Sequence, residues 1–337
     1  MTAYQKRSLI MKEHVESFTK KLNEAIAIGE ASKMTPPENE IRNILVTGLG
    51  GSGIGGTVLA QILEQQINIP ILVCKDYFIP AYVNKHTLVI VSSYSGNTEE
   101  TLQALGIALE RKAKIVCVSG GGKVIEIAKA NNLDHILIPH GMPPRACFPY
   151  SFTQLFYVLI GLKLIKADYN DQLKNVLALL NAETENIKRD AKKLADQLFG
   201  KTIVIYSAAN YEGVCVRFRQ QINENSKLLC WHAAIPEMNH NELVGWVDKN
   251  DSLAVIFFRN NDDFYRTQKR MDFVKEVVSN CTPHIHEVWS KGTTQLEKAF
   301  YFVLFGDWVS VYLAELKNID ATEVRVIDKL KSSLATV

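Results

Sequence analysis

Two stretches decide the fold: LVTGLGGSGIGG at residues 45–56 and LVIVSSYSGNTEET at residues 88–101. Each begins as an apolar run, passes through a loop of very small residues and continues as a helical sequence. Strands that turn tightly into helices build parallel sheets, and glycines in the turn let the backbone approach a ligand. The second loop adds hydroxyl groups, from Ser93, Ser95 and Thr98. Together the loops predict a pocket for a phosphorylated sugar at the edge of a parallel sheet.

The same alternation continues through the first half of the chain. Strand-like runs are NILVTG, IPILVCK, LVIVSSY, KIVCVSG and ILIP, and helical runs such as TVLAQILEQQ and TEETLQALGIALERK lie between them. Strands that alternate with helices imply crossover connections between parallel strands. The sequence therefore predicts an α/β domain with helices flanking the sheet.

The second half repeats this pattern. TIVIYSAANYEGVCVRFRQQ mirrors the first strand–turn–helix unit, SLAVIFFRNND mirrors the second strand, and IHEVWSKG mirrors IVCVSGGG. A roughly constant offset between the copies indicates a duplicated α/β sandwich. The second copy lacks the glycines and serines, and Asn260, Asn261 and Asp262 stand where the serines were. We expect it to keep the fold but not the phosphate site.

Helical segments frame the two halves. One amphipathic helix is predicted near the start, from apolar residues at helical spacing that precede Pro36 and Pro37: Val15, Phe18, Leu22 and Ile26. Helices around 152–164 and 171–198 lead into the second half, and VIDKLKSSLA closes the chain. The predicted organisation is an N-terminal helical segment at 1–40, a first domain at 41–165, a second domain at 166–318 and a C-terminal helix at 319–337.

Composition excludes several classes of protein. Of the 337 residues, 47% are apolar and 22% charged, and the net charge of +2 does not suit a nucleic-acid binder driven by bulk charge. The six cysteines form no CxxC pair, which favours a reducing cytoplasm. The first residues, MTAYQKRSLIMKEH, lack the apolar stretch of a signal peptide. The apolar stretch FTQLFYVLIGLKLI contains polar side chains and predicts a buried helix rather than a membrane span.

The first loop is also open to another interpretation. Gly48, Gly50 and Gly53 satisfy G-x-G-x-x-G between a strand and a helix, and Asp76 could serve as the acid that binds a ribose. A dinucleotide-dependent enzyme is therefore a rival hypothesis. Gly55 and Gly56 extend the small residues into the helix, which suggests that the helix packs closely against a neighbour.

The hydroxyl cluster of the second loop has a structural alternative too. Thr98 or Asn97 could simply cap the following helix. A cap accounts for one residue rather than the cluster, whereas a phosphate held by the helix amides and the hydroxyls accounts for all of them. No P-loop lysine follows, so a nucleoside triphosphate is not expected.

Three polar residues are candidates for chemistry. Arg145 follows two prolines in HGMPPRACFPY, a rigid turn that could aim it at an anion or leave it on the surface. Glu224 and His240 are each flanked by asparagines, and a carboxylate with an imidazole is the usual set for metal-free proton transfer. The alternative is an asparagine-rich helix end. His284 and His286 share a strand face, but further ligands for a metal are not apparent.

These motifs carry a resemblance to a known family. LVTGLGGSGIGG, VSSYSGNTEET, MPPRA, QINENSK and EMNHNELVGW together resemble the bifunctional phosphoglucose/phosphomannose isomerases, a branch of the sugar isomerase (SIS) superfamily. The resemblance covers nearly the whole chain. It implies two tandem SIS-type domains, each a parallel sheet flanked by helices in a three-layer sandwich.

The resemblance also implies substrate-binding residues. Gly51 and Ser52 match the first-loop contacts of the family, and its phosphate-binding hydroxyls match Ser93, Ser95 and Thr98.

For catalysis, the family pattern makes Arg145 the residue that steadies the enediolate and Glu224 the general base. His240 matches the ring-opening acid, which in this family reaches in from the other subunit of a dimer. The pattern I-x-x-L-K gives Lys331 as the C-terminal catalytic lysine, with Lys329 as the neighbouring alternative. The chain departs from the family at Ser226, where alanine is usual, and is less typical over 228–234.

The implied function is interconversion of glucose 6-phosphate, and also mannose 6-phosphate, with fructose 6-phosphate through an enediol intermediate. The resemblance implies a cytoplasmic homodimer with a shared active site and with no metal or cofactor. It implies a small sugar phosphate as the only substrate, without nucleic-acid or membrane partners. A non-catalytic SIS protein that binds phosphosugars and an NAD(P)-dependent oxidoreductase are the alternatives.

Overall fold

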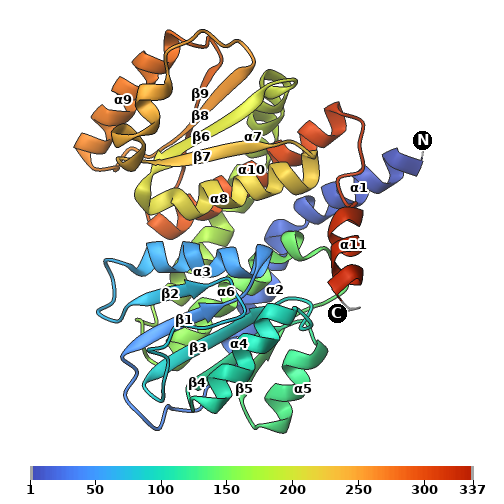
Figure 1. Cartoon of the computed structure of the whole chain (residues 1–337), viewed down its shortest axis with the longest axis vertical. Coiled ribbons are helices and arrows are strands. Elements are labelled where there is room, and N and C mark those ends of the chain that lie inside the picture. The colour runs from blue at the N-terminus through green and yellow to red at the C-terminus, as the bar shows by residue number, and fades with distance from the viewer. Residues whose placement is uncertain (1–2, 335–337) are drawn as a thin grey trace.

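A computed structural model describes residues 3–334, with side chains described from Ile10 onward. It contains two parallel sheets, each flanked by helices (Figure 1). This confirms the predicted α/β class with two SIS-type domains.

The first sheet has five parallel strands in the order β2-β1-β3-β4-β5. They are β1 (Asn43–Thr47), β2 (Ile71–Cys74), β3 (Thr87–Ser93), β4 (Lys114–Ser119) and β5 (Asp134–Leu137). Helices α3 (Gly50–Leu63), α4 (Glu99–Glu110) and α5 (Gly122–Ala130) connect them. β3 is buried along its whole length because helices cover both of its faces.

The second sheet has four parallel strands in the order β7-β6-β8-β9. They are β6 (Thr202–Ala208), β7 (Cys230–Ile235), β8 (Leu253–Arg259) and β9 (Ile285–Trp289). Helix α8 (Glu212–Gln221) returns the chain from β6 to β7, and α9 (Tyr265–Ser279) connects β8 to β9. The order β2-β1-β3-β4 of the first sheet matches β7-β6-β8-β9, which is the duplication expected from the sequence.

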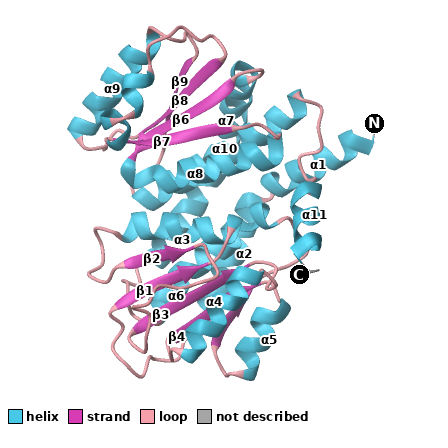
Figure 2. Ribbon diagram, in the orientation of Figure 1, coloured by secondary structure: helices cyan, strands magenta, loops and turns pink. Residues whose placement is uncertain are grey.

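The two sheets share one large core. Helices α3 and α8 pack against each other between the sheets (Figure 2). Around them lie α2 (Phe18–Ala31), α6 (Phe148–Gly161), α7 (Tyr169–Leu198) and α10 (Gln295–Leu316). A single cluster of buried apolar residues runs from one sheet through these helices to the other. A smaller cluster fills the space between the first sheet and α4 and α5.

Helix α10 is an element that the sequence analysis did not predict. It has 22 residues and is apolar enough to cross a membrane by length and composition, but 89% of its most apolar window is buried inside the molecule. It packs mainly against α7, and also against α1 and α8. Its apolar character all round the axis is therefore that of a central core helix.

The start of the chain also differs from expectation. The single predicted helix is two helices, α1 (Ala3–Glu16) and α2, separated at Ser17. Val15 belongs to α1, whereas Phe18, Leu22 and Ile26 lie on the buried face of α2. The predicted strand ILIP is β5, which begins two residues earlier at Asp134. The C-terminal helix is α11 (Arg325–Leu334), which begins six residues after the predicted start at 319; the predicted end at 337 lies outside the described residues.

Candidate active site

The two small-residue loops lie side by side at the carboxyl ends of β1 and β3. These strands are neighbours, and the chain leaves them in opposite directions, to β2 on one side and to β4 on the other. Such a topological switch point opens a crevice where ligands bind in open α/β sheets. The sequence therefore places both loops at the position in the fold that suits a ligand.

Close backbone contacts hold the loops together and require their glycines. A Cβ at Gly48 would lie 2.4 Å from the Ser92 carbonyl oxygen, and one at Gly53 would lie 2.1 Å from the Gly48 carbonyl oxygen. At Gly56 it would lie 2.8 Å from Val46, so α3 packs hard onto β1. These contacts explain Gly48, Gly53 and Gly56 by packing within the sheet and its loops, without a dinucleotide, whereas Gly50 has a positive φ of 52°.

Ser52 connects the first loop to the second. Its side chain is buried, and its hydroxyl accepts a hydrogen bond of 3.1 Å from the Tyr94 backbone N–H. The Tyr94 hydroxyl in turn accepts from the Met142 N–H at 3.1 Å, just before the turn that carries Arg145. Gly51 lies against that same turn, because a Cβ there would be 3.3 Å from Arg145 Cα. The loop after β1, the loop after β3 and the turn that carries Arg145 thus contact one another on one side of the candidate site.

The hydroxyl groups of Ser93, Ser95 and Thr98 lie close together in the structure. Ser93 Oγ donates to Thr98 Oγ1 at 3.2 Å, and Ser95 Oγ lies 3.5 Å from the same oxygen. Thr98 occupies the N-cap position of α4, but its side chain makes no capping hydrogen bond. The capping alternative therefore accounts for the position of Thr98 at the start of α4. It does not account for the Thr98 hydroxyl, which contacts the two serines and not the helix. Three hydroxyls beside the amino end of α4 suit an anion such as phosphate.

Arg145 is buried in a short helical turn, η1 (Pro144–Cys147). All three guanidinium nitrogens donate hydrogen bonds: Nε to Asn225 Oδ1 at 2.6 Å, Nη1 to Glu224 Oε2 at 3.3 Å, and Nη2 to the Ala321 carbonyl at 2.6 Å. Burial lowers the pKa of Arg145, and the charges of Glu224 and Asp320 oppose this. Arg145 is thus a fixed positive charge and not a surface side chain.

Glu224 projects from a π-helical turn, η3 (Ile222–Ser226), that ends α8. Its neighbours Asn225 and Ser226 are fully buried and bind α10: Asn225 Nδ2 donates to Ser310 Oγ at 2.9 Å, and Ser226 Oγ donates to the Ser310 carbonyl at 2.7 Å. The Glu224 side chain stays 30% exposed. The widened turn therefore buries the two neighbours and presents the carboxylate toward Arg145.

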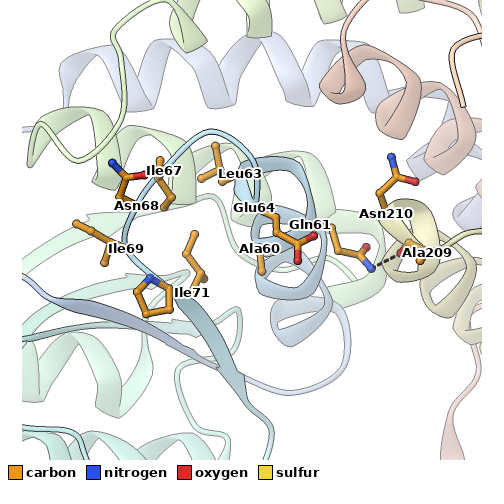
Figure 3. Close-up of a pocket in the computed structure, with 11 residues that line it drawn as sticks. Ala60, Gln61, Leu63, Glu64, Ile67, Asn68, Ile69, Ile71, Ala209 and Asn210 are labelled. Atoms are coloured by element: carbon orange, nitrogen blue, oxygen red, sulfur yellow. Dashed lines mark hydrogen bonds between the residues drawn. The ribbon is translucent and has the colours of Figure 1, made fainter. Parts of the chain in front are cut away.

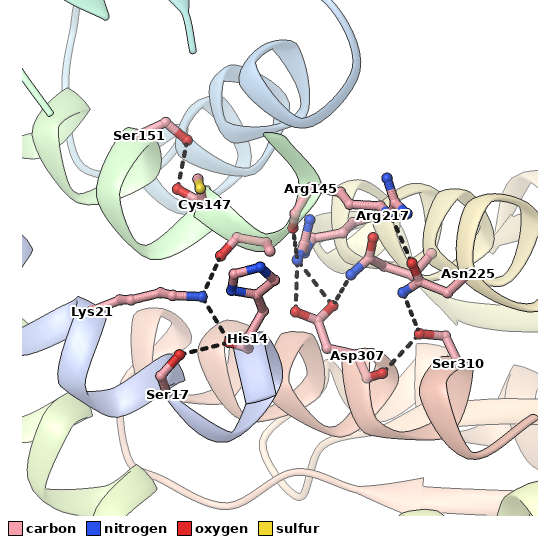
Figure 4. Close-up of polar contacts among 12 residues, drawn as sticks. His14, Ser17, Lys21, Arg145, Cys147, Ser151, Arg217, Asn225, Asp307 and Ser310 are labelled. Atoms are coloured by element: carbon pink, nitrogen blue, oxygen red, sulfur yellow. Dashed lines mark hydrogen bonds and ion pairs between the residues drawn. The ribbon is translucent and has the colours of Figure 1, made fainter. Parts of the chain in front are cut away.

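A buried polar layer behind Arg145 was missed by sequence reasoning (Figure 4). Arg217 donates to both oxygens of Asp307, at 2.9 and 2.7 Å, and to the Arg145 carbonyl at 3.2 Å. Gln221 Nε2 also donates to Asp307, at 2.7 Å. The available signal was Asp307, a carboxylate within the largely apolar stretch 299–314. This layer holds the Arg145 turn against α8 and α10.

His240 does not join this group within one chain. It is exposed in a short turn, η4 (Glu237–His240), after β7, and within residues 3–334 its ring makes no hydrogen bond or ion pair. Glu224 lies where α8 ends, before β7 begins. β7 has six residues and spans roughly 20 Å, at about 3.3 Å per residue. His240 and Glu224 therefore lie at opposite ends of the second sheet.

The C-terminal lysines are placed near the site but not in it. The carbonyls of Ala321 and Thr322 accept hydrogen bonds from Arg145, and these residues lie four and three positions before the start of α11 at Arg325. Every residue of α11 is exposed, and neither the Lys329 nor the Lys331 ammonium makes a hydrogen bond or ion pair inside the described range. The structure does not choose between the two lysines.

A separate groove lies between the two domains at the far end of α3. Its lining includes Gln61, Glu64 and Asn210, and the Gln61 amide donates to the Ala209 carbonyl across the domain boundary (Figure 3). Gly50 and Gly51 are at the other end of the same helix, so this groove contains none of the predicted site residues. We place the candidate site at the loops.

In the second domain, a side chain fills the position equivalent to the phosphate loop. Asp263 is buried, and its carboxylate accepts from the Asn260 backbone N–H and side-chain amide, each at 3.1 Å. In the second domain the Asp263 carboxylate thus accepts the hydrogen bond of the Asn260 backbone N–H, at the position where the first domain has its phosphate loop. This agrees with the expectation that the second copy retains only the fold.

Comparisons with known proteins agree with this geometry. Residues 39–148 match the SIS domain family, and residues 187–334 match the bacterial phospho-glucose isomerase C-terminal SIS domain. A bifunctional phosphoglucose/phosphomannose isomerase from Caldicellulosiruptor bescii is 36% identical, over 97% of this chain and 99% of its own. The chain belongs to the bifunctional phosphoglucose/phosphomannose isomerase family.

Two further comparisons concern a second family member and a solved structure. The family member from Aquifex aeolicus is 33% identical over 90% of this chain and 92% of its own. The C-terminal domain of glucosamine-fructose-6-phosphate aminotransferase from Francisella tularensis has a TM-score of 0.77 at 14% identity, covering 94% of this chain and 98% of its own. The double-SIS architecture therefore persists where little sequence similarity remains.

Proposed function

We propose that this protein interconverts glucose 6-phosphate and mannose 6-phosphate with fructose 6-phosphate. The observation that carries the proposal is the pairing of Arg145 with Glu224 at 3.3 Å, beside the loop that contains Gly51. A carboxylate next to a fixed cation and an anion site can move a proton while the cation stabilises the charge that develops. Membership of the isomerase family supports the same chemistry.

Each group has a distinct role in the proposed reaction. Ser93, Ser95 and Thr98 bind the phosphate, which orients the sugar and contributes binding energy far from the reacting carbons. His240, together with Lys331 or Lys329, transfers the proton that opens the ring. Glu224 removes the proton from C2 and returns it to C1, and Arg145 stabilises the enediolate. The two aldose epimers differ only at C2 and give the same enediol, so one base can serve both.

The proposed site needs a second copy of the chain. His240 and Glu224 lie at opposite ends of the second sheet, which supports the proposal that His240 completes the site from a partner subunit. The exposed apolar residues of α11, which form one stripe along the helix, also suit an interface: Val326, Ile327, Leu330 and Leu334. We therefore propose a homodimer with two shared active sites.

The first test is direct. The purified protein is incubated with glucose 6-phosphate and, separately, mannose 6-phosphate, in EDTA and without added cofactor, and fructose 6-phosphate is measured. Product from both substrates supports the proposal, and product from one narrows it to that epimer. No product, with a phosphosugar that still raises the melting temperature, would indicate a binding protein instead.

The shared site has its own test. Glu224→Gln and His240→Ala are each expected to fold normally and lose turnover. After mixing in equal amounts and refolding together, half of the dimers should be mixed, each with one intact site, which gives about one quarter of the wild-type activity. Failure to recover activity, in mixtures shown to exchange subunits, would rule out a site that combines Glu224 of one subunit with His240 of the other.

A further inference from the structure

We propose that Glu242 and Tyr206 are positioning residues that hold His240 in place for ring opening. This inference rests on the proposed function and concerns how the exposed imidazole keeps a defined position. His240 lies in the connection between β7 and β8, which contains only the short turns η4 and η5 (Glu242–Gly245). A general acid works only from a defined position, so such a connection must be fastened by side chains.

Tyr206 supplies the anchor on the sheet. It lies in β6 with no exposed surface, and its ring contacts Phe257 of β8. The next residue of β8, Phe258, stacks on Phe218 of α8, so Tyr206 and Phe257 face away from α8. The Tyr206 hydroxyl therefore lies on the side of the second sheet away from α8.

Glu242 binds that anchor two residues after His240. Its Oε1 accepts a hydrogen bond from the Tyr206 hydroxyl and another of 3.0 Å from Trp231 Nε1 on β7. Trp246 Nε1 donates to the Tyr206 hydroxyl at 3.0 Å, which closes the network. Burial, and then Glu242, raise the pKa of Tyr206, so its hydroxyl stays a donor to the carboxylate.

The residues on both sides of His240 are fixed as well. Asn239 Oδ1 accepts from Arg270 of α9 at 3.4 Å, and the Asn241 side chain accepts from the Glu242 N–H at 2.6 Å and donates to Glu237 at 2.9 Å. These contacts hold the backbone on each side of His240, whose own ring has no hydrogen-bond or ion-pair partner in residues 3–334. Side-chain hydrogen bonds therefore hold both neighbours of the exposed His240 imidazole.

The test combines Glu242→Gln and Tyr206→Phe with His240→Ala. We call the contact of Glu242 with Tyr206 the clamp, and Glu242→Gln and Tyr206→Phe the clamp variants. Each single clamp variant should lower kcat about tenfold or more with KM within about twofold, because His240 is displaced rather than removed. In the His240→Ala background, adding Glu242→Gln should slow the enzyme no further, since both changes act through one group. Tyr211→Phe is the matched control, because Tyr211 is a buried tyrosine of the same domain outside this network.

Either of two results would overturn the inference: wild-type kcat in both clamp variants, or an equal further loss when Glu242→Gln is added to His240→Ala. A second readout does not depend on activity. Amide hydrogen exchange over 237–247 should speed up in the clamp variants and stay unchanged in Tyr211→Phe. If the wild-type protein proves inactive, the proposed function fails, and the exchange experiment still decides whether Glu242 and Tyr206 fasten the segment.

Discussion

At the scale of single residues, the site depends on side chains that bind two partners at once. Asn225 accepts from Arg145 and donates to Ser310, so it sets the guanidinium relative to α10. Such an amide has no freedom to rotate, because its oxygen and its NH₂ group each have a defined partner. The asparagine beside Glu224 therefore positions the arginine, and the carboxylate between the two asparagines remains available to substrate.

Ser226 provides a prediction at this scale. Ser226→Ala removes the hydrogen bond to the Ser310 carbonyl and should lower the free energy of unfolding by about 1 kcal/mol. Because the hydroxyl points at α10 and not at Arg145, kcat should stay within about twofold of wild type. Denaturant unfolding and steady-state kinetics check both parts, and a large loss of kcat would show that the π turn depends on this hydroxyl.

At the scale of elements, the close approach of the first loop to its own backbone can be tested with two glycines. Gly53→Ala places a methyl group 2.1 Å from the Gly48 carbonyl oxygen, which should cost about 1–3 kcal/mol of stability and weaken substrate binding. Gly106→Ala in α4 meets nothing within 4 Å and should stabilise the protein by about 0.5–1 kcal/mol. Similar melting temperatures and KM values for the two variants would contradict the packing argument.

The amino end of α10 predicts a pH dependence. Thr294 and Glu297 form a capping box, and the Glu297 carboxylate also accepts from the Thr293 N–H at 2.9 Å. Burial of Glu297 raises its pKa, but the hydrogen bonds from Thr294 and Thr293 outweigh burial and hold the pKa below its usual value. A depressed carboxyl pKa stabilises the fold above the unfolded-state value, near 4.3, and this contribution is lost as the pH falls through the folded-state value.

Glu297→Gln should therefore be less stable than wild type by about 1 kcal/mol at pH 7, and the difference should shrink as the pH falls below about 4. Thermal melts from pH 7 to pH 3 measure it. Glu276→Gln on α9 is the control, since Glu276 is exposed and its carboxylate makes no hydrogen bond in residues 3–334. A difference that stays constant with pH would rule out the ionised carboxylate as its cause.

At the scale of the whole molecule, α11 continues the chain but buries none of its residues against the rest of the protein. None of its residues is buried, and Lys329 and Lys331 flank its apolar stripe on opposite sides. Deleting residues 325–337 should leave the fold of the single subunit nearly unchanged, because no residue of α11 is buried, while lowering kcat, because both the proposed catalytic lysine and the proposed interface stripe are removed. Lys331→Ala and Lys329→Ala then show which lysine acts, and full activity in the truncated protein would exclude both.

The sequence by itself determined the duplicated α/β architecture, because strand, small-residue loop and helix recur in the same order in both halves. It also indicated the hydroxyl loop as a candidate phosphate site, whereas for Arg145 it left a surface position open, and only the resemblance to the family joined the two. Helix α10 escaped prediction because a helix that is apolar on all sides has no periodicity to detect.

Only the tertiary structure decided how distant residues combine. Asp307 lies 90 positions from Arg217, yet their pairing holds the turn that carries Arg145. The separation of His240 from Glu224 follows from the direction of β7, and the clamp on His240 follows from the face of the sheet on which Tyr206 lies. Such relations depend on how elements far apart in sequence pack, which local propensity and spacing do not encode.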